Sequence, residues 1–172
     1  MNKHEVFESK RLILKPTTEI DAELIFKLLN SPPWLEYVGD REINSIEDAK
    51  RYINLKIIPQ LKELGYSSYT VLRKVDNIKI GICTLFDRKG MNGVDIGFAL
   101  LPEFQRKGYA FEATDKLFDI AFNIFDLKEL LATTKMKNIP SQKLLEKLGM
   151  KLHSTIIHPQ DGKEKLLYKI KR

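Results

Sequence analysis

Cysteine is nearly absent from this chain of 172 residues, which holds one, Cys83, together with three histidines. A single cysteine excludes an internal disulfide and any metal site built on several thiolates. Cys83 lies in the apolar run 80–86, which is typical of a buried strand, so we expect a small core side chain rather than a nucleophile. His4, His153 and His158 show no paired spacing, and no metal centre is expected.

Long apolar runs are absent as well. No segment approaches the roughly 18 apolar residues that cross a bilayer, and residues 1–10 are charged, unlike a secretory signal. We therefore expect a cytoplasmic protein with no membrane partner. Glycine (9 residues) and proline (7 residues) are sparse, and no repeat or low-complexity linker divides the chain, so residues 1–172 are expected to form one domain.

Negative charge is in short supply, because the formal net charge is +6. Residues 151–172 hold six Lys/Arg against two acids, a net charge of +4 in this tail. The tail fits a solvated C-terminal hairpin. A basic balance also favours an anionic ligand, but it does not distinguish a nucleic acid from a phosphorylated cofactor. No interleaved basic and aromatic motif supports nucleic-acid binding.

Hydrophobic periodicity predicts an α+β layout. Strands are predicted at 11–16, 69–73, 78–86, 94–100, 130–135, 151–157 and 165–169. Helices are predicted at 18–30, at 45–64 with a kink or break at Pro59, after Gly108, and at 139–148. Turn-rich links around 76–77 and 87–93 indicate an antiparallel meander, whereas the helix after Gly108 makes the next strand parallel to its predecessor.

The segment Gln105–Ala110 joins a strand to the long helix and is shaped for an anion. The first amides of a helix have no intrahelical partner and lie at the positive end of its dipole. Gly108 removes a side chain where an anion would approach the backbone, and Ala110 keeps the next turn thin. Arg106 and Lys107 add positive charge. Together these features predict a cradle for a pyrophosphate.

These residues also resemble a known family. The loop satisfies the Gln/Arg-x-x-Gly-x-Gly/Ala pattern of the GNAT superfamily of acyl-CoA-dependent N-acetyltransferases. Within it, the chain is similar to the ribosomal-protein-alanine N-acetyltransferase group. Four pieces carry the likeness: Ser9–Pro16, Asp95–Pro102, Gly108–Ala113 and Asn138–Gly149. The resemblance implies a mixed, mostly antiparallel central sheet with helices on both faces.

The resemblance further implies acetyl-CoA (coenzyme A) as the cofactor. Its pyrophosphate would meet the loop formed by Gln105, Arg106, Lys107, Gly108, Tyr109 and Ala110. Its pantetheine arm would run along the backbone of Phe98, Ala99 and Leu100, like an extra strand where two sheet strands separate. Asn138 occupies the family position that contacts this arm, although it is also a good helix N-cap.

Two residues are candidates for the chemistry. Asp95 stands where the group commonly has a glutamate, and it would act as the base, through water because aspartate is shorter. The alternative is a strand-end acid that faces solvent or makes a local hydrogen bond. Ser141 would donate a hydrogen bond to the departing thiolate. The alternative for Ser141 is an ordinary polar residue in the first turn of a helix.

The acceptor is the least defined element. Trp34 and Tyr37 lie on a predicted proline-bounded loop, where they would line an acceptor groove or be buried in the core. The favoured activity is acetyl transfer to a primary amine, above all a protein N-terminal α-amine, by direct attack in a ternary complex. A polyamine or aminoglycoside acceptor is open, with Glu36, Asp40 and Glu42 as its acidic groups.

Two alternatives belong to other classes: an acyl-CoA sensor without catalysis, and a basic nucleic-acid module. The sensor would bind the cofactor without turnover, and the nucleic-acid module would show binding that collapses with salt. The sequence leaves a monomer and a homodimer equally open.

Overall fold

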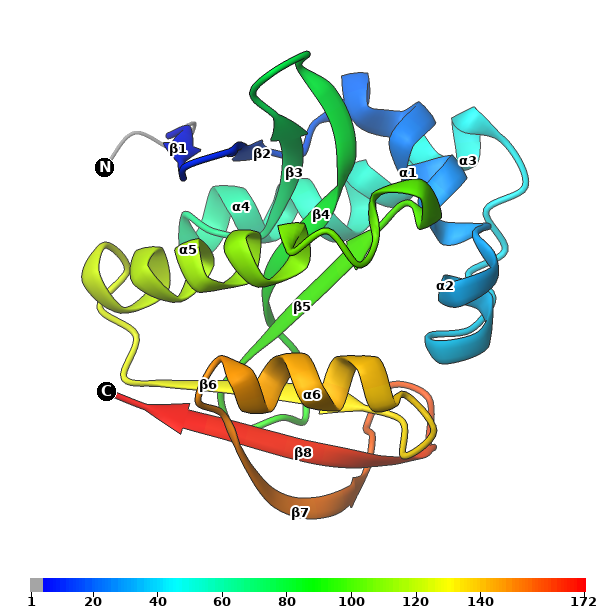
Figure 1. The fold of residues 1–172 in the computed structure, drawn as a ribbon. Coiled ribbons are helices and arrows are strands. Elements are labelled where there is room, and N and C mark those ends of the chain that lie inside the picture. Colours follow the sequence, from blue (N-terminus) through cyan, green and yellow to red (C-terminus); the bar gives the residue numbers. More distant parts are fainter. Residues whose placement is uncertain (1–4) are drawn as a thin grey trace.

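The computed structural model describes residues 5–172, in which eight strands form one sheet with helices around it (Figure 1). The strands are β1 (Phe7–Glu8), β2 (Leu12–Pro16), β3 (Ser68–Arg73), β4 (Ile78–Asp87), β5 (Val94–Leu100), β6 (Glu129–Thr134), β7 (Lys151–Ile157) and β8 (Glu164–Lys171). Their spatial order is β1-β2-β3-β4-β5-β6-β8-β7. Only β5 and β6 are parallel, so the predicted meander, crossover and mostly antiparallel sheet are confirmed.

Helices cover both faces of this sheet. They are α1 (Ala22–Leu29), α2 (Pro32–Tyr37), α3 (Ile46–Tyr52), α4 (Ile58–Leu64), α5 (Tyr109–Asn123) and α6 (Ile139–Lys147), with short 3-10 turns at Glu19–Asp21 and Pro102–Phe104. Successive residues of β4 face opposite sides. Cys83 packs in the core beneath α5, whereas Ile82 packs with α1 and α3. Cys83 is thus the core side chain that was expected, and burial raises the pKa of its thiol.

The sheet divides where β5 meets β6. These two strands pair only at Val94 with Leu130 and at Asp95 with Leu131. Beyond Asp95, β5 continues to pair with β4 as far as Leu100, while β6 continues along β8. The two halves of the sheet therefore diverge, as Figure 1 shows for β5 and β6. One edge of β5 from Gly97 to Leu100 is left without a strand partner.

The structure corrects the prediction of a loop at residues 31–40. Pro32–Tyr37 form the short helix α2, with both prolines in its first turn and Ser31 as the N-cap. Proline breaks a helix when it lies in the interior. In the first turn of a helix, however, its missing N–H and fixed φ are well tolerated. The prolines that end α1 therefore also begin α2, which carries Trp34 and Tyr37.

The predicted break at Pro59 is confirmed and takes the form of a π-turn. The helix expected over 45–64 consists of α3, a π-helical turn at Ile53–Ile57, and α4. The amide of Ile58 donates to the carbonyl of Ile53, five residues earlier. The wider turn fits a proline that supplies no N–H and would crowd the carbonyl four residues before it.

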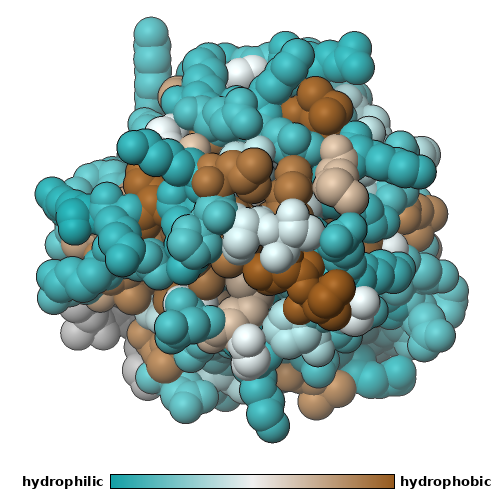
Figure 2. Space-filling view, turned by 90° about the horizontal axis from the view of Figure 1, so that it is seen from below, coloured by the Kyte–Doolittle hydropathy of each residue, from teal (hydrophilic) through white to brown (hydrophobic). Residues whose placement is uncertain are grey.

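The interpretation of the basic tail as a solvated hairpin is wrong for its second strand. β8 lies inside the sheet between β6 and β7, and its Tyr168 is 1% exposed. Of the two strands in this tail, β7 is the one at the edge of the sheet, and it exposes Leu152 and Ile157. Figure 2 views the molecule from below, the side on which Figure 1 places β7 and β8, and shows brown side chains among mostly teal ones. In residues 5–172, no helix is long and apolar enough to span a membrane.

Candidate active site

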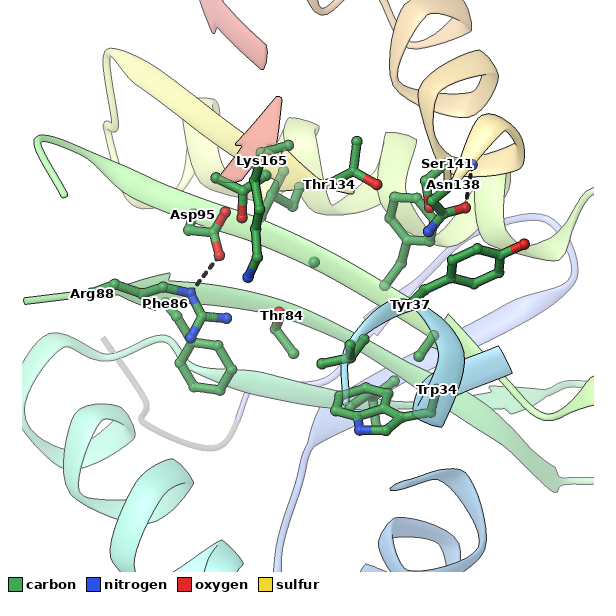
Figure 3. A pocket seen from close by; sticks show the side chains of 18 of the residues that line it. Trp34, Tyr37, Thr84, Phe86, Arg88, Asp95, Thr134, Asn138, Ser141 and Lys165 are labelled. Atoms are coloured by element: carbon green, nitrogen blue, oxygen red, sulfur yellow. Dashed lines mark hydrogen bonds and ion pairs between the residues drawn. The ribbon is translucent and has the colours of Figure 1, made fainter. Parts of the chain in front are cut away.

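A pocket occupies the wedge between the two halves of the sheet (Figure 3). Its walls come from both halves, because β4 and β5 contribute Thr84 and Gly97 while β6 contributes Thr134. Helices α2 and α6 complete the walls with Trp34, Tyr37, Asn138 and Ser141. All four of these predicted residues, together with Asp95, Phe98 and Ala99, therefore line one pocket, although they lie far apart in the sequence.

Asp95 is a buried carboxylate in this pocket, only 4% exposed. Its Oδ2 accepts a hydrogen bond from Nε of Arg88, so the interpretation of Asp95 as a solvent-facing acid is wrong and the local hydrogen bond is present. Burial raises the pKa of Asp95, and this effect outweighs the nearby charges of Arg88 and Lys165. Figure 3 shows Lys165 reaching into the pocket beside this carboxylate.

The second oxygen of Asp95, Oδ1, is buried and has no hydrogen-bond partner of good geometry within residues 5–172. The main-chain N–H of Thr133 lies near enough to favour the charged carboxylate, but it does not complete such a bond with Oδ1. A buried acceptor without a partner costs about 1–3 kcal/mol, so the site gains from any ligand or water that donates to it.

The N-terminus of α6 presents Asn138 and Ser141 together (Figure 3). Oδ1 of Asn138 accepts from the main-chain N–H of Ser141 at 3.2 Å, which makes Asn138 the N-cap of the helix. The cap uses the side-chain oxygen and leaves the Nδ2 donor to other partners. Both side chains line the pocket, so the cap and a ligand contact are compatible.

Helix α2 closes the pocket on the side of its aromatic residues. Trp34 packs against the α1–α3 core while also lining the pocket, so core packing does not withdraw it from the pocket. Its Nε1 is buried without a hydrogen-bond partner among the described residues. Nζ of Lys135, at the end of β6, donates to the main-chain carbonyl of Glu36 at 2.7 Å and fastens α2 across the wedge.

The elbow before α5 has the backbone form that a phosphate site requires. Gly108 is the N-cap with a φ of 79°, in the left-handed region, and Arg106 has a φ of 59°. Because glycine has no side chain to cap the helix, the first amides of α5 stay open to a ligand. The side-chain amide of Gln105 donates to the carbonyl of Leu100 at 3.0 Å, which ties the elbow to the end of β5.

Arg11 supports this elbow, and sequence reasoning did not single it out. Its Nη1 donates to the carbonyl of Lys107 at 3.1 Å, and its Nε donates to Glu112 at 2.6 Å. Its guanidinium covers the buried ring of Tyr109 at 4.5 Å, so Tyr109 offers a ligand its amide rather than its phenol. A Cβ on Gly108 would lie 3.3 Å from Nη2 of Arg11.

The residues predicted to hold a cofactor thus fall into two sets. Phe98, Ala99 and Asn138 line the wedge, whereas Leu100 and the elbow lie beyond the pocket. The unpaired edge of β5 runs from one set to the other. Free main-chain groups along a strand, followed by helix amides at a left-handed glycine, fit a long ligand with an amide-bearing arm and a diphosphate.

Cationic side chains in the pocket were not predicted by position. Arg41, Arg88, Lys135 and Lys165 all line it, and they come from four separate segments. The only sequence signal was the overall excess of Lys and Arg. His158 is buried beside them, and its pKa is lowered by burial and then by Lys165. His4 lies outside the described residues, within which no cluster of three or more metal-ligating side chains occurs.

Comparison with known proteins places the chain in a family context. Residues 11–151 match the model of the acetyltransferase (GNAT) domain. An uncharacterized N-acetyltransferase of Bacillus subtilis, YnaD, is 25% identical over 143 residues, which cover 83% of this chain and 81% of YnaD.

Solved structures share the fold at lower identity. The ribosomal-protein-S5-alanine acetyltransferase of Vibrio fischeri has a TM-score of 0.79 and 18% identity, covering 97% of this chain and 96% of that one. The RimL ribosomal L7/L12 α-N-protein acetyltransferase in complex with coenzyme A has a TM-score of 0.82 and 17% identity, covering 97% and 98%.

Proposed function

Because the chain belongs to the GNAT family of acetyl-CoA-dependent N-acetyltransferases, we propose that its acceptor is the α-amine of a protein N-terminus. The family determines the reaction, an acetyl transfer from acetyl-CoA to an amine. The acceptor and the roles of individual residues are our proposal. One observation carries it: the pocket is lined by a single carboxylate, Asp95, among four cationic side chains.

A lone, partly neutralised carboxylate suits an α-amine better than a lysine. At neutral pH an α-amine with a pKa of about 8 is neutral roughly once in ten molecules, and a lysine with a pKa of about 10.4 roughly once in 2,500. An α-amine therefore needs only about 1 kcal/mol of help from a base, against nearly 5 kcal/mol for a lysine. A single carboxylate such as Asp95, which is paired with Arg88, would have to supply only the smaller amount of help.

Asp95 is proposed to receive the proton of the amine through its unpartnered Oδ1. This atom is buried without a hydrogen-bond partner among the described residues, so an amine N–H, or a water between the amine and Asp95, would donate to it. The raised pKa of Asp95 makes the carboxylate a stronger base than an exposed aspartate. Arg88 holds the carboxylate in place through Oδ2, so Oδ1 is the oxygen left to accept the proton.

The elbow and α6 are proposed to hold the cofactor. Amides of residues 106–110 would bind its diphosphate, and the free edge of β5 at 98–100 would pair with its pantetheine arm. Nδ2 of Asn138 would donate to the same arm. Ser141 would donate a hydrogen bond to the sulfur as negative charge develops there. When bound, acetyl-CoA supplies the activated acetyl group.

The main rival acceptor, a polycationic small molecule, fits this pocket poorly. It would need several acidic side chains, for which Glu36, Asp40 and Glu42 were the candidates. All three are exposed, and none lines the pocket. Like charges across a binding surface cost affinity, so the cations of the wedge oppose a polyamine or aminoglycoside.

A thiol-release assay with acetyl-CoA tests the acceptor. The panel contains peptides with a free α-amine, the same peptides with a blocked N-terminus and an internal lysine, a polyamine and an aminoglycoside. We expect release with free N-termini, and mass spectrometry should place the acetyl group on the α-nitrogen. Faster acetylation of the polyamine or the lysine peptide would overturn the proposal. Cofactor binding without release from any acceptor, unchanged in Ser141→Ala, would indicate a sensor.

A further inference from the structure

The pocket is rich in positive charge from segments that meet only in the folded chain. Arg41 follows α2, Arg88 follows β4, Lys135 follows β6 and Lys165 lies on β8. A pocket for a protonated amine would ordinarily carry carboxylates to attract it. This pocket carries Asp95 alone, and that carboxylate is already bound to Arg88.

Two of these four cationic side chains form ion pairs with carboxylates, and the other two form none within the described part of the chain. Arg88 is paired with Asp95, and Nζ of Lys165 lies 2.8 Å from Oδ2 of Asp161. Within residues 5–172, neither Arg41 nor Lys135 forms an ion pair. Lys135 donates to a main-chain carbonyl, which orients its ammonium without cancelling its charge.

The acidic residues beside Arg41 in the sequence do not change this balance inside the wedge. Asp40 and Glu42 flank Arg41, but both are exposed and neither lines the pocket. The Asp40 carboxylate instead accepts from the main-chain N–H of Glu42 at 2.7 Å. Arg41 is the member of this trio that reaches the pocket wall.

The surrounding lysine charges also act on the pKa values of two groups in the pocket, after the larger effect of burial. Burial lowers the pKa of Lys135, and the charges of Lys163 and Lys165 lower it further, while Asp161 and Glu36 oppose them only in part. The pKa of His158 is lowered by burial first and then by Lys165. Both groups lie against the pocket, so a bound ammonium would meet the same repulsion.

From this geometry, and resting on the proposed function, we infer that the acceptor is an acidic N-terminus, with a carboxylate side chain close to the α-amine that Arg41 and Lys135 bind. The carboxylate offsets the repulsion between the pocket and the protonated amine. The same cations then favour loss of the amine's proton, because like charge disfavours the charged form. Charge complementarity would therefore select the acceptor and also prepare it for reaction.

Peptides that share an N-terminal residue and differ only at the next two positions test this inference. The three versions carry Asp-Asp, Asn-Asn or Lys-Lys at these positions. Aspartate and its diamide serve as small acceptors that again compare carboxylates with neutral amides. We expect kcat/KM to be about tenfold higher for the Asp-Asp peptide than for the Asn-Asn peptide, and lower again for Lys-Lys. Equal rates, or faster acetylation of Lys-Lys, would overturn the inference.

Substitutions of Arg41 and Lys135 test whether these residues cause the preference for acidic peptides. Arg41→Glu should reverse the order of the Asp-Asp and Lys-Lys peptides through KM, and Lys135→Gln, which keeps a donor toward Glu36, should weaken the preference by about threefold to fivefold. Arg51→Glu is the matched control: this arginine is 69% exposed on α3, pairs with Asp48 and does not line the pocket. A preference that Arg41→Glu leaves intact would contradict the inference.

The outcomes separate this inference from the proposed function. Acetylation of all free N-termini at equal rates keeps the proposed function and overturns the charge preference. Acetylation of aspartate over its diamide, with no peptide acetylated, overturns the protein acceptor and keeps the charge preference. No acetylation of any acceptor overturns both.

Discussion

Among single residues, Gly108 is under two separate constraints, a left-handed backbone conformation and a neighbouring side chain that leaves little room for a Cβ. Its φ of 79° is costly for residues with a Cβ, and a Cβ would also stand 3.3 Å from Arg11 at the mouth of the elbow. Gly65 has nearly the same backbone, with a φ of 84°, but open space around it. The pair therefore separates backbone strain from obstruction of a ligand.

We predict that Gly108→Val and Gly65→Val lose similar stability, about 1–2 kcal/mol each, because the left-handed strain is shared. Only Gly108→Val should weaken coenzyme A binding, by about tenfold or more, which corresponds to about 1.4 kcal/mol. Chemical denaturation gives the stabilities and isothermal titration gives the affinities. Equal coenzyme A affinity in the two variants would contradict the assignment of the elbow.

The pKa of Asp95 is raised in the folded protein, and the sign of this shift determines how a substitution of Asp95 changes the stability. The folded protein holds the proton of Asp95 more readily than the unfolded chain does. The contribution of Asp95 to stability is therefore present below its ordinary pKa of about 4 and is lost as pH rises through the raised value. Asp95→Asn should gain stability relative to the native chain across that rise, as thermal unfolding at several pH values would show.

The same variant should lose activity in a way that depends on the acceptor. At neutral pH, Asp95→Asn should acetylate an α-amine up to about tenfold more slowly, because without the base only about one α-amine in ten is neutral. At about pH 9 most of the α-amine is already neutral, so the variant should approach the native rate. Loss that persists at the higher pH would show that Asp95 does more than accept this proton.

At the scale of elements, α6 combines a structural cap with a candidate ligand contact, and substitutions can separate them. Asn138→Ala should cost about 1 kcal/mol of stability through loss of the cap to Ser141. Asn138→Asp keeps the capping oxygen but lacks the amide donor, so it should stay stable while the KM for acetyl-CoA rises. Ser45→Ala is the control, because it removes the N-cap of α3 at Ser45, a residue that does not itself line the pocket.

An unchanged KM in Asn138→Asp would mean that the side-chain amide does not contact the cofactor. Its role would then be the cap alone. A rise in KM in Ser45→Ala would instead show that loss of a cap anywhere disturbs the site.

Elements with a local signal could be predicted from the sequence, and those decided by context could not. The amphipathic pattern after Gly108 and the glycine itself sufficed for α5 and its elbow, because both depend on neighbouring residues. Helix α2 was missed because prolines that end one helix can begin the next. The two-residue strand β1 is too short to show any period.

At the scale of the whole molecule, the candidate site depends on a sheet order that the sequence does not state. Asp95, Asn138 and Ser141 could be chosen as candidates because they lie in the segments that carry the family resemblance. Lys165 could not, because it reaches the pocket only when β8 inserts between β6 and β7. Charge in the pocket is thus a property of the topology rather than of any single motif.

Binding of the cofactor should stabilise the whole fold, since the elbow, β5 and α6 are joined through one ligand. Coenzyme A at about one hundred times its Kd adds about 2.7 kcal/mol to the free energy of unfolding. For a chain of this size we predict a rise in Tm of about 5–10 °C. A thiol fragment of the arm without phosphates should give a much smaller rise in a thermal-shift assay. Equal shifts would argue against a phosphate contribution.

The most direct test of the account is a crystal structure of this protein with coenzyme A. The account predicts phosphate oxygens within about 3 Å of main-chain nitrogens in residues 106–110, with the pantetheine arm along the free edge of β5. Phosphates bound elsewhere, with that turn unoccupied, would contradict it.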